Sequence, residues 1–418
     1  MNHCGTKFMS ICDNALTMIS ILGISGLIIF GFFFVMVKTN AENVNVDIVG
    51  SMGNNKSNAI FAKTLDYLYE QANSFLTKRP TSVMDKTQLP PSGDRHDFLD
   101  LAPYCWPDSA SPNGLPYICD DARGTNPEFY AIPDYTNMLD MISRVKILSL
   151  AYHFSENDSY ASKAADLIRV WFLDYDTKMN PNMQYSELVR GKNSGTPHGI
   201  IGGKDFPEIL ESIRLIEKSP SWTNRDEQGI KRWFSAYLDW LLNSTAAIKE
   251  GKSKNNHGTW YDVQASAIAL FVNKTDITEK ILKKWMDKQI AIQILPDGRQ
   301  PLELKRPIAL TYSLFNLLGL FKLANIGENV GIDLWNFKTH EGAGLQKALD
   351  YLVPYISNKS SWPYKQDGPI DMHTVVKLLH EAAIHYPDNE LYKQAYGSMD
   401  RKYLIANIDN LANMGLDK

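Results

Sequence analysis

One short segment combines side chains that can bind an anion with one that can move a proton. Residues 254–260 read Lys-Asn-Asn-His-Gly-Thr-Trp and stand just before an apolar helical stripe. Asparagine is a strong helix N-cap, so we expect Asn255 or Asn256 to cap the helix and His257 to lie in its first turn. The free backbone N–H groups and the positive end of the helix dipole would favour an anion there, such as a sugar carboxylate. An ordinary cap beside a surface histidine is the alternative.

A second segment places an arginine near a tyrosine. Residues 303–316 read Glu-Leu-Lys-Arg-Pro-Ile-Ala-Leu-Thr-Tyr-Ser-Leu-Phe-Asn. Pro307 suits the first position of a helix, which would place Arg306 at the helix mouth and Tyr312 in the second turn. A nearby cation favours phenolate, so we expect a lowered pKa for Tyr312 and a role in proton transfer. A core tyrosine on a helix rich in Leu and Phe is the alternative.

The elements that must position these residues are predicted to be helices. Apolar stripes with helical spacing recur from Ala59 onward, and convincing alternating strands are few. The clearest stripe consists of Ile230, Trp233, Phe234, Tyr237, Leu238 and Leu241. Successive helical hairpins of similar length predict an all-α fold, an α/α toroid of inner and outer helices around a cleft. An irregular helical bundle is the alternative. Two long loops, 85–133 and 179–205, are rich in Pro, Gly and aromatic residues and are expected to be functional.

Together the two segments resemble the alginate lyase superfamily, helical-toroid polysaccharide lyases that act on polyuronates. The stretch NNHGTW resembles the family's Asn-Asn-His-x-x-Trp, and ELKR with a tyrosine six residues after the arginine is similar to its Arg/Tyr segment. The resemblance implies that the catalytic residues are Asn256, His257, Arg306 and Tyr312.

The early loop is also similar to the loop that precedes the toroid in the family. It contains DRHDFLDLAPYCWPD, then GLPY, then RGTNPE, and the resemblance extends over about residues 85–356. The matching positions in this loop are Asp97, Tyr104, Trp106, Pro116, Tyr117, Asn126 and Pro127. One departure concerns Tyr312, which is followed by Ser-Leu-Phe-Asn rather than the His-Asn of mannuronate-type lyases. This form is closer to relatives that cleave glucuronan-type chains.

The implied reaction is β-elimination. The C5 proton of a uronate is barely acidic until the carboxylate is neutralised, a task for Asn256, His257 and Arg306. A base then removes the proton and an acid protonates the leaving O4. If both leave from one face, Tyr312 can serve in both roles; if they leave from opposite faces, His257 would be the base and Tyr312 the acid. Neither a metal nor a cofactor is required.

Further residues are expected to bind the acidic polysaccharide. Arg190, Lys192 and His198 lie in the second long loop and could bind the carboxylates of neighbouring sugars, although a solvated loop explains them equally well. The expected substrate-binding set also includes Tyr104, Trp106, Tyr117, Trp260 and Lys254. Asp205 and Glu208 lie only three residues apart, so we interpret them as a helix start rather than as paired glycosidase acids.

The N-terminus is predicted to be a targeting segment. The uncharged run Ala15–Val37 is long enough to cross a hydrocarbon core, which favours an uncleaved signal anchor. A signal peptide cleaved near residues 39–41 is the alternative. We therefore divide the chain into an anchor or signal at 1–41, a linker at 42–57 and a single catalytic domain at 58–418. Sequons after the apolar run stand at Asn55, Asn157, Asn243, Asn273 and Asn358. They fit a secreted protein or one on the extracellular or luminal face of a membrane.

Composition and cysteine usage limit the remaining possibilities. The chain has 418 residues and a net charge of −4, which argues against a nucleic-acid binder. Only one long apolar run exists, so membrane contact is expected through the N-terminal helix alone, and the body is expected to be a monomer. Cys105 and Cys119 could pair in an oxidising compartment or remain two free thiols. A glycoside hydrolase on a similar toroid and a non-catalytic glycan-binding relative are the competing functions.

Overall fold

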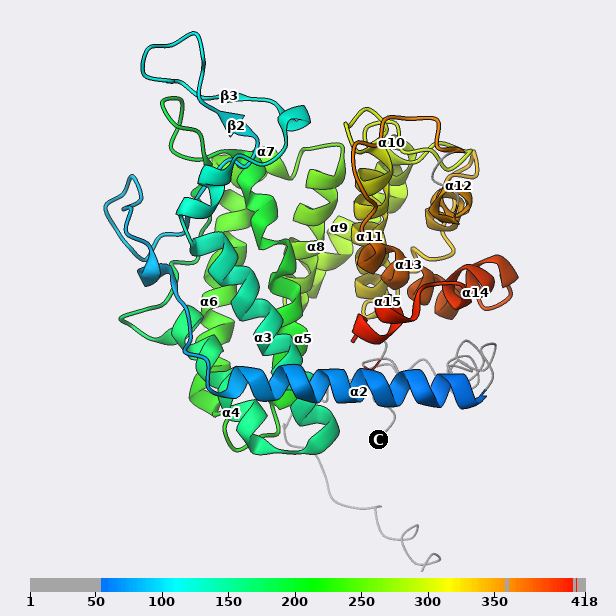
Figure 1. Cartoon of the computed structure of the whole chain (residues 1–418), viewed down its shortest axis with the longest axis horizontal. Helices are drawn as coiled ribbons and strands as arrows, with labels where there is room; N and C mark the ends of the chain where they lie inside the picture. The colour runs from blue at the N-terminus through cyan, green and yellow to red at the C-terminus, as the bar shows by residue number, and fades with distance from the viewer. Residues whose placement is uncertain (1–53, 358–360, 409–410, 412–418) are drawn as a thin grey trace, which may run out of the picture. The chain divides into compact units, whose positions relative to one another are not determined.

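The described part of the chain is mostly helical, as the periodicity predicted (Figure 1). The computed structural model describes residues 54–357, 361–408 and 411. The apolar run Ala15–Val37, its cleavage site and the sequon at Asn358 lie outside the described residues. Helix α2 begins at Asn54 and so includes the last residues of the predicted linker.

The long helices are α2 (Asn54–Leu76), α3 (Asp134–Ser155), α4 (Asp158–Ile168), α5 (Phe206–Ile216), α6 (Asn224–Asn243), α8 (Asn256–Phe271), α9 (Thr275–Lys284), α11 (Ala309–Glu328), α12 (Leu345–Ser357) and α13 (Met372–His385). Shorter helices are α7 (Thr245–Glu250), α10 (Ile290–Gln293), α14 (Glu390–Gly397) and α15 (Arg401–Ala406). Single turns of 3-10 helix include η2 (Asp121–Arg123) and η3 (Pro127–Ala131), and a longer 3-10 segment is η5 (Pro197–Asp205).

Five helices form a row in which each contacts the next. The row runs α3, α5, α8, α11, α13. Other helices contact members of this row: α4 contacts α3, α6 and α9 contact α8, α12 contacts α11, and α14 contacts α13. Helix α2 runs along one side, where it contacts α3 and α15 (Figure 1). Helices distant in sequence are therefore tied together through a chain of neighbours.

Helix α8 lies between two hydrophobic cores, and this explains its composition. Tyr261, Ala265 and Ile268 belong to the first core, whereas Trp260 and Val263 belong to the second. A helix that is buried on both sides needs apolar residues all round. The helix that carries His257 is thus anchored on both sides, and its N-terminal end has a fixed position.

Helix α11 is also central. By length and composition it is apolar enough to cross a membrane, but most of it is buried inside the protein, where it contacts α8, α12 and α13. It is a core helix of the described body. Its N-terminal end carries Tyr312.

The few strands organise the two long loops. Strands β1 (Leu99–Leu101) and β4 (Tyr185–Leu188) pair in parallel, which joins the first loop to the second. Strands β2 (Cys105–Trp106) and β3 (Ile118–Cys119) pair antiparallel with Cys105 opposite Cys119, and the two cysteines form a disulfide. Of the two alternatives for these cysteines, the structure shows the paired one.

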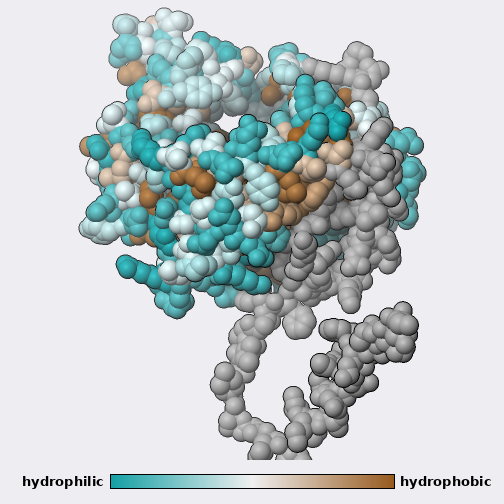
Figure 2. Space-filling model, turned by 60° about the horizontal axis from the view of Figure 1, so that its bottom comes forward, coloured by the Kyte–Doolittle hydropathy of each residue, from teal (hydrophilic) through white to brown (hydrophobic). Residues whose placement is uncertain are grey.

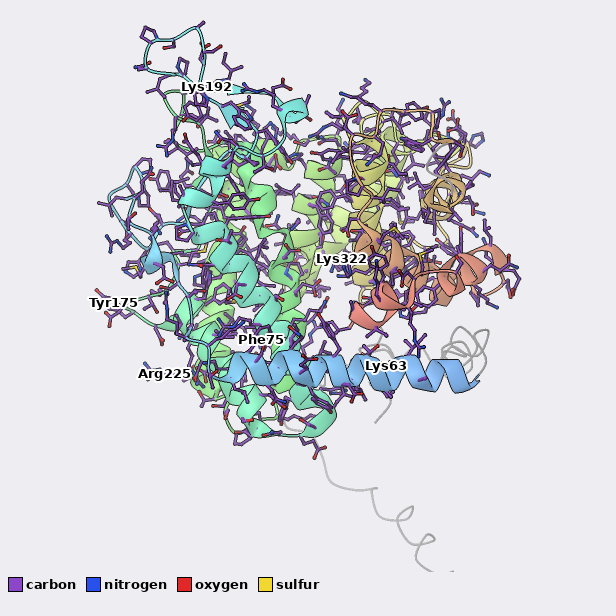
Figure 3. All side chains as sticks on the ribbon, viewed as in Figure 1. Lys63, Phe75, Tyr175, Lys192, Arg225 and Lys322 are labelled. Atoms are coloured by element: carbon purple, nitrogen blue, oxygen red, sulfur yellow. A yellow bond between two sulfur atoms is a disulfide. The ribbon has the colours of Figure 1, made fainter. Side chains whose placement is uncertain are left out.

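Glu208 serves the fold rather than a hydrolytic reaction. It forms ion pairs with Lys146 of α3 at 2.8 Å and with Lys322 of α11 at 2.6 Å; Figure 3 shows Lys322 on α11. Burial acts to raise the pKa of Glu208, but the lysines outweigh it and hold that pKa well below its usual range. Asp205 is the N-cap of α5 and contacts Lys204. The interpretation of this pair as a helix start is confirmed.

The surface carries only dispersed apolar residues among those described. Figure 2 shows a mainly polar face with small apolar patches. The exposed large apolar side chains are Leu89, Leu115, Ile118, Tyr130, Tyr175, Ile248, Ile292 and Leu391. They come from many different elements, so they do not define a docking surface.

Candidate active site

The first candidate segment forms the start of α8, as predicted. Asn255 is the N-cap residue, although its side chain makes no capping hydrogen bond, and His257 lies in the first turn. A Cβ atom on Gly258 would lie 2.0 Å from the carbonyl oxygen of Ser253. Only glycine fits there, so the residue after His257 is dictated by the close approach of the preceding turn.

His257 is held by a buried carboxylate. Its Nδ1 atom lies 2.6 Å from Glu250 Oε1, and the Glu250 side chain is only 1% exposed. Burial acts to raise the pKa of Glu250, but its contacts with His198 and His257 outweigh burial and lower that pKa. Because an ionised carboxylate only accepts hydrogen bonds, His257 donates from Nδ1, and the neutral form of the ring has its lone pair on Nε2. This tautomer is the one required of a general base.

His198 approaches the same carboxylate from η5. Its Nδ1 atom lies 3.4 Å from Glu250 Oε2, and its ring meets the His257 ring edge-on with centroids 4.9 Å apart. The contact with Glu250 raises the pKa of His198. The structure thus brings His198 next to His257, which the sequence did not predict. Glu187 is close enough to both histidines to interact with them electrostatically.

Asn256 is tied to a second buried carboxylate. Its backbone N–H and its side-chain Nδ2 each donate to Glu303, both at 2.7 Å. Both residues are about 1% exposed. The Glu303 carbonyl in turn accepts the backbone N–H of Arg306 at 3.0 Å. Glu303 therefore connects the start of α8 to the segment that leads into α11, and it brings the two candidate segments together.

Arg306 and Tyr312 form a close pair. An Arg306 terminal nitrogen donates to the Tyr312 hydroxyl at 2.7 Å, and the guanidinium lies 3.8 Å from the centroid of the tyrosine ring. The helix begins at Ala309 rather than at Pro307, so Tyr312 lies in the first turn and not in the second. The prediction of Pro307 as the first helical residue was wrong, because the chain stays irregular through Ile308.

The prediction of a lowered tyrosine pKa was also wrong. Burial raises the pKa of Tyr312, and the neighbouring Tyr104, which hydrogen-bonds it, raises it further. Arg306 lowers the pKa but only in part. Desolvation outweighs the cation, so Tyr312 is a neutral phenol that can give up a proton.

The disulfide-linked loop closes onto this pair. Asp121 of η2 accepts from Arg306 Nε at 3.0 Å. Tyr104 stands beside Cys105 at the other end of the loop, and its carbonyl oxygen accepts the Asp120 N–H at 3.0 Å. The loop thus contributes a phenol to Tyr312 and a carboxylate to Arg306.

Three of the residues that were predicted to bind substrate form hydrogen bonds within the loops. Tyr117 donates to Glu128 at 2.9 Å, and Arg190 Nε donates to the same carboxylate at 3.1 Å. Trp106 donates to the Gly124 carbonyl oxygen at 3.3 Å. Each of these contacts stabilises the polar loops that border the site.

The other three residues that were predicted to bind substrate differ in burial. Lys192 and Lys254 are exposed, and Figure 3 shows Lys192 on the loop near β2 and β3. Trp260 is only 2% exposed and stacks on Phe315 with ring centroids 4.9 Å apart. The expectation that Trp260 contacts sugar was therefore wrong. Trp260 belongs to the second hydrophobic core, about one turn along α8 from His257.

The carboxylates Glu187, Glu250, Glu303 and Asp121 were not identified from the sequence. One signal was present for Glu250, which is the last residue of α7. An acidic residue at a helix C-terminus opposes the helix dipole, so another interaction must hold it there. Glu303 was part of the second segment, but nothing in its spacing indicated that it would reach Asn256.

A family model for alginate lyases matches residues 82–362. The chain belongs to the alginate lyase family. Membership confirms the resemblance drawn from the three motifs and supports a polysaccharide lyase enzyme.

Solved structures agree. An alginate lyase from Bacteroides ovatus has 34% identity and a TM-score of 0.79, over 88% of this chain and 99% of that one. A variant of alginate lyase A1-III complexed with a tetrasaccharide has 14% identity and a TM-score of 0.53, over 79% of this chain and 88% of that one. The second likeness shows the fold alone. No curated protein matches the chain.

Proposed function

We propose that the protein is a lyase that cleaves a uronic-acid polysaccharide, glucuronan or polymannuronate, by β-elimination. One observation carries this proposal: Glu303 binds both Asn256 and the Arg306 backbone, and so holds His257 and Tyr312 at two neighbouring helix ends. A base with a free lone pair and a neutral acid thereby border one site. The row of contacting helices from α3 to α13 supports the α/α toroid as the architecture around it.

The substrate carboxylate would be held by Arg306 with the help of the N-terminal end of α8. As the C5 proton leaves, charge develops on this carboxylate, and fixed donors stabilise it without reorganising. His257 Nε2 accepts the C5 proton, and the ionised Glu250 stabilises the imidazolium that forms. Tyr312 donates its proton to O4 of the leaving sugar. In glucuronan and polymannuronate the C5 proton and O4 lie on the same face of the ring, the case in which Tyr312 alone can serve both roles. The assignment of the base to His257 therefore requires that His257 and Tyr312 both reach that face, and the His257→Ala variant distinguishes the two assignments.

The test is a polymer panel with the full-length chain. Polyglucuronate, polymannuronate, polyguluronate and hyaluronan are each incubated with the protein, and the ultraviolet absorbance of the C4–C5 double bond is followed. Tyr312→Phe and His257→Ala should each lower the rate by about 10²–10⁴-fold. Tyr175→Phe and His340→Ala are matched controls on exposed residues and should leave it unchanged.

Each outcome has a definite meaning. Retention of the rate on polyglucuronate by His257→Ala, together with its loss in Tyr312→Phe, would assign both proton transfers to Tyr312. Reducing ends without the absorbance would establish a hydrolase and refute the elimination.

We also propose that the body resides in the secretory lumen or outside the cell. The sequons at Asn157, Asn243 and Asn273 are all on exposed residues, and the disulfide suits an oxidising compartment. A shift in mass on treatment of the protein from a eukaryotic host with a glycosidase that removes N-linked chains would support this, and an unchanged mass would count against it.

A further inference from the structure

Three residues from separate segments form a compact group of metal-ligand type. They are His198 in η5, Glu250 at the end of α7 and His257 in α8, and their donor atoms all lie within 4.8 Å of one another. Two imidazole nitrogens and one carboxylate oxygen are a ligand set that zinc and similar divalent transition metals prefer. The Nδ1 atoms of both histidines flank the same carboxylate.

The carboxylate in this group is incompletely satisfied. Glu250 Oε1 has a short hydrogen bond to His257, whereas the buried Oε2 has only the 3.4 Å contact with His198. A buried carboxylate oxygen without a close partner is costly. A second buried carboxylate, Glu187, lies close enough to interact with the group. The exposed Lys249 is also close enough to His198 to act against a positive charge there, but both histidines of the group interact with the two carboxylates. The surroundings therefore favour an added positive charge.

We propose that His198, Glu250 and His257 bind a divalent transition-metal cation, with zinc as the representative, and that this cation inhibits the enzyme. The His198 side chain is 62% exposed, so it can move toward the metal and leaves a path for entry from solvent. The more buried His257 and Glu250 supply the fixed part of the site. The three donor atoms already lie within 4.8 Å of one another, so short side-chain movements bring them to bonding distance of one cation.

The inhibition would arise because a metal on one ring nitrogen of His257 removes the lone pair from the other. This step rests on the proposed function, in which His257 is the base. A metal on His257 Nδ1 uses the lone pair that is created there when the Nδ1 proton moves to Nε2. A neutral imidazole then has no lone pair left on Nε2, so it cannot accept the C5 proton. The metal needs no contact with the substrate to stop the reaction.

The binding test is calorimetric titration of the full-length chain with zinc chloride in a buffer that does not chelate metals, after removal of metals with EDTA. One equivalent of zinc should bind. His198→Asn should weaken binding by at least about tenfold, and because this side chain is exposed the fold should be kept. Glu250→Gln should weaken it further. His340→Asn, which changes an exposed histidine far along the sequence, is the matched control and should bind zinc as the unmodified chain does.

The activity test is separate. With the preferred polymer, zinc should suppress the rate at the concentrations at which it binds, and His198→Asn should require at least about tenfold more zinc. Absence of a one-to-one binding event, equal affinity in His198→Asn, or a rate that rises with zinc would each overturn the inference. Because binding is measured without substrate, the inference can be tested even if every polymer in the panel proves inert.

Discussion

Replacement of Glu250 by glutamine should slow the reaction without weakening substrate binding. The buried carboxylate holds His257 Nδ1 at 2.6 Å and stabilises the imidazolium that forms when the C5 proton is accepted. A hydrogen bond to a charged group contributes about 1.5–3 kcal/mol. Since each 1.36 kcal/mol is a factor of ten in rate, kcat should fall by about 10- to 150-fold. Glu250 does not face the substrate in the proposed mechanism, so KM should change little.

The assay is the initial rate of double-bond formation over a range of polymer concentrations, with the melting temperature measured in parallel. Glu341→Gln is a matched control, because it makes the same chemical change on an exposed residue. Glu250→Asp should recover part of the rate, since it restores the charge with a shorter reach. A kcat for Glu250→Gln within threefold of the unmodified chain, with the fold intact, would refute the assigned role of the carboxylate.

Three further predictions concern binding and stability. Asp121→Asn should lower KM by about two- to fivefold, because the Asp121 carboxylate competes with the substrate for Arg306 across a partly exposed ion pair; a raised KM would show that Asp121 positions the arginine instead. Burial acts to raise the pKa of Asp226, but hydrogen bonds from Arg169 and Thr223 outweigh it and lower that pKa to about 2. Ionised Asp226 should therefore contribute about 2 kcal/mol to the free energy of unfolding; this contribution is complete well above pH 4 and is lost as the pH falls toward 2. The unfolding free energies of Asp226→Asn and the unmodified chain should differ at pH 7 and converge near pH 2. Trp260→Ala should cost about 3–5 kcal/mol of stability in denaturant unfolding, as expected of a core residue, whereas a stable variant with a raised KM would return Trp260 to the sugar-binding set.

The sequence was most informative where the chemistry is local. Helical spacing predicted the all-α fold, and the Asn-Asn-His segment correctly predicted the start of α8. The pair Asp205 and Glu208 was correctly assigned to a helix start, since a cap and its first turn are determined by neighbours in the chain.

The sequence was least informative about long-range contacts. Glu303 reaches Asn256 across 47 residues, and Asp121 reaches Arg306 across 185. No local pattern encodes these pairs. The pKa of Tyr312 was predicted in the wrong direction for the same reason, because the sequence shows the nearby Arg306 but not the burial or the contact with Tyr104.

Mass analysis of the cleaved polymer tests the central claim most directly. The full-length chain is incubated with polyglucuronate and with polymannuronate, and the oligosaccharides are measured beside those from Tyr312→Phe. Elimination predicts fragments whose new non-reducing ends are lighter than hydrolysis products by one water, and the variant should yield almost none. Fragments that carry the added water, or unsaturated fragments formed equally well by Tyr312→Phe, would contradict elimination with Tyr312 as its acid.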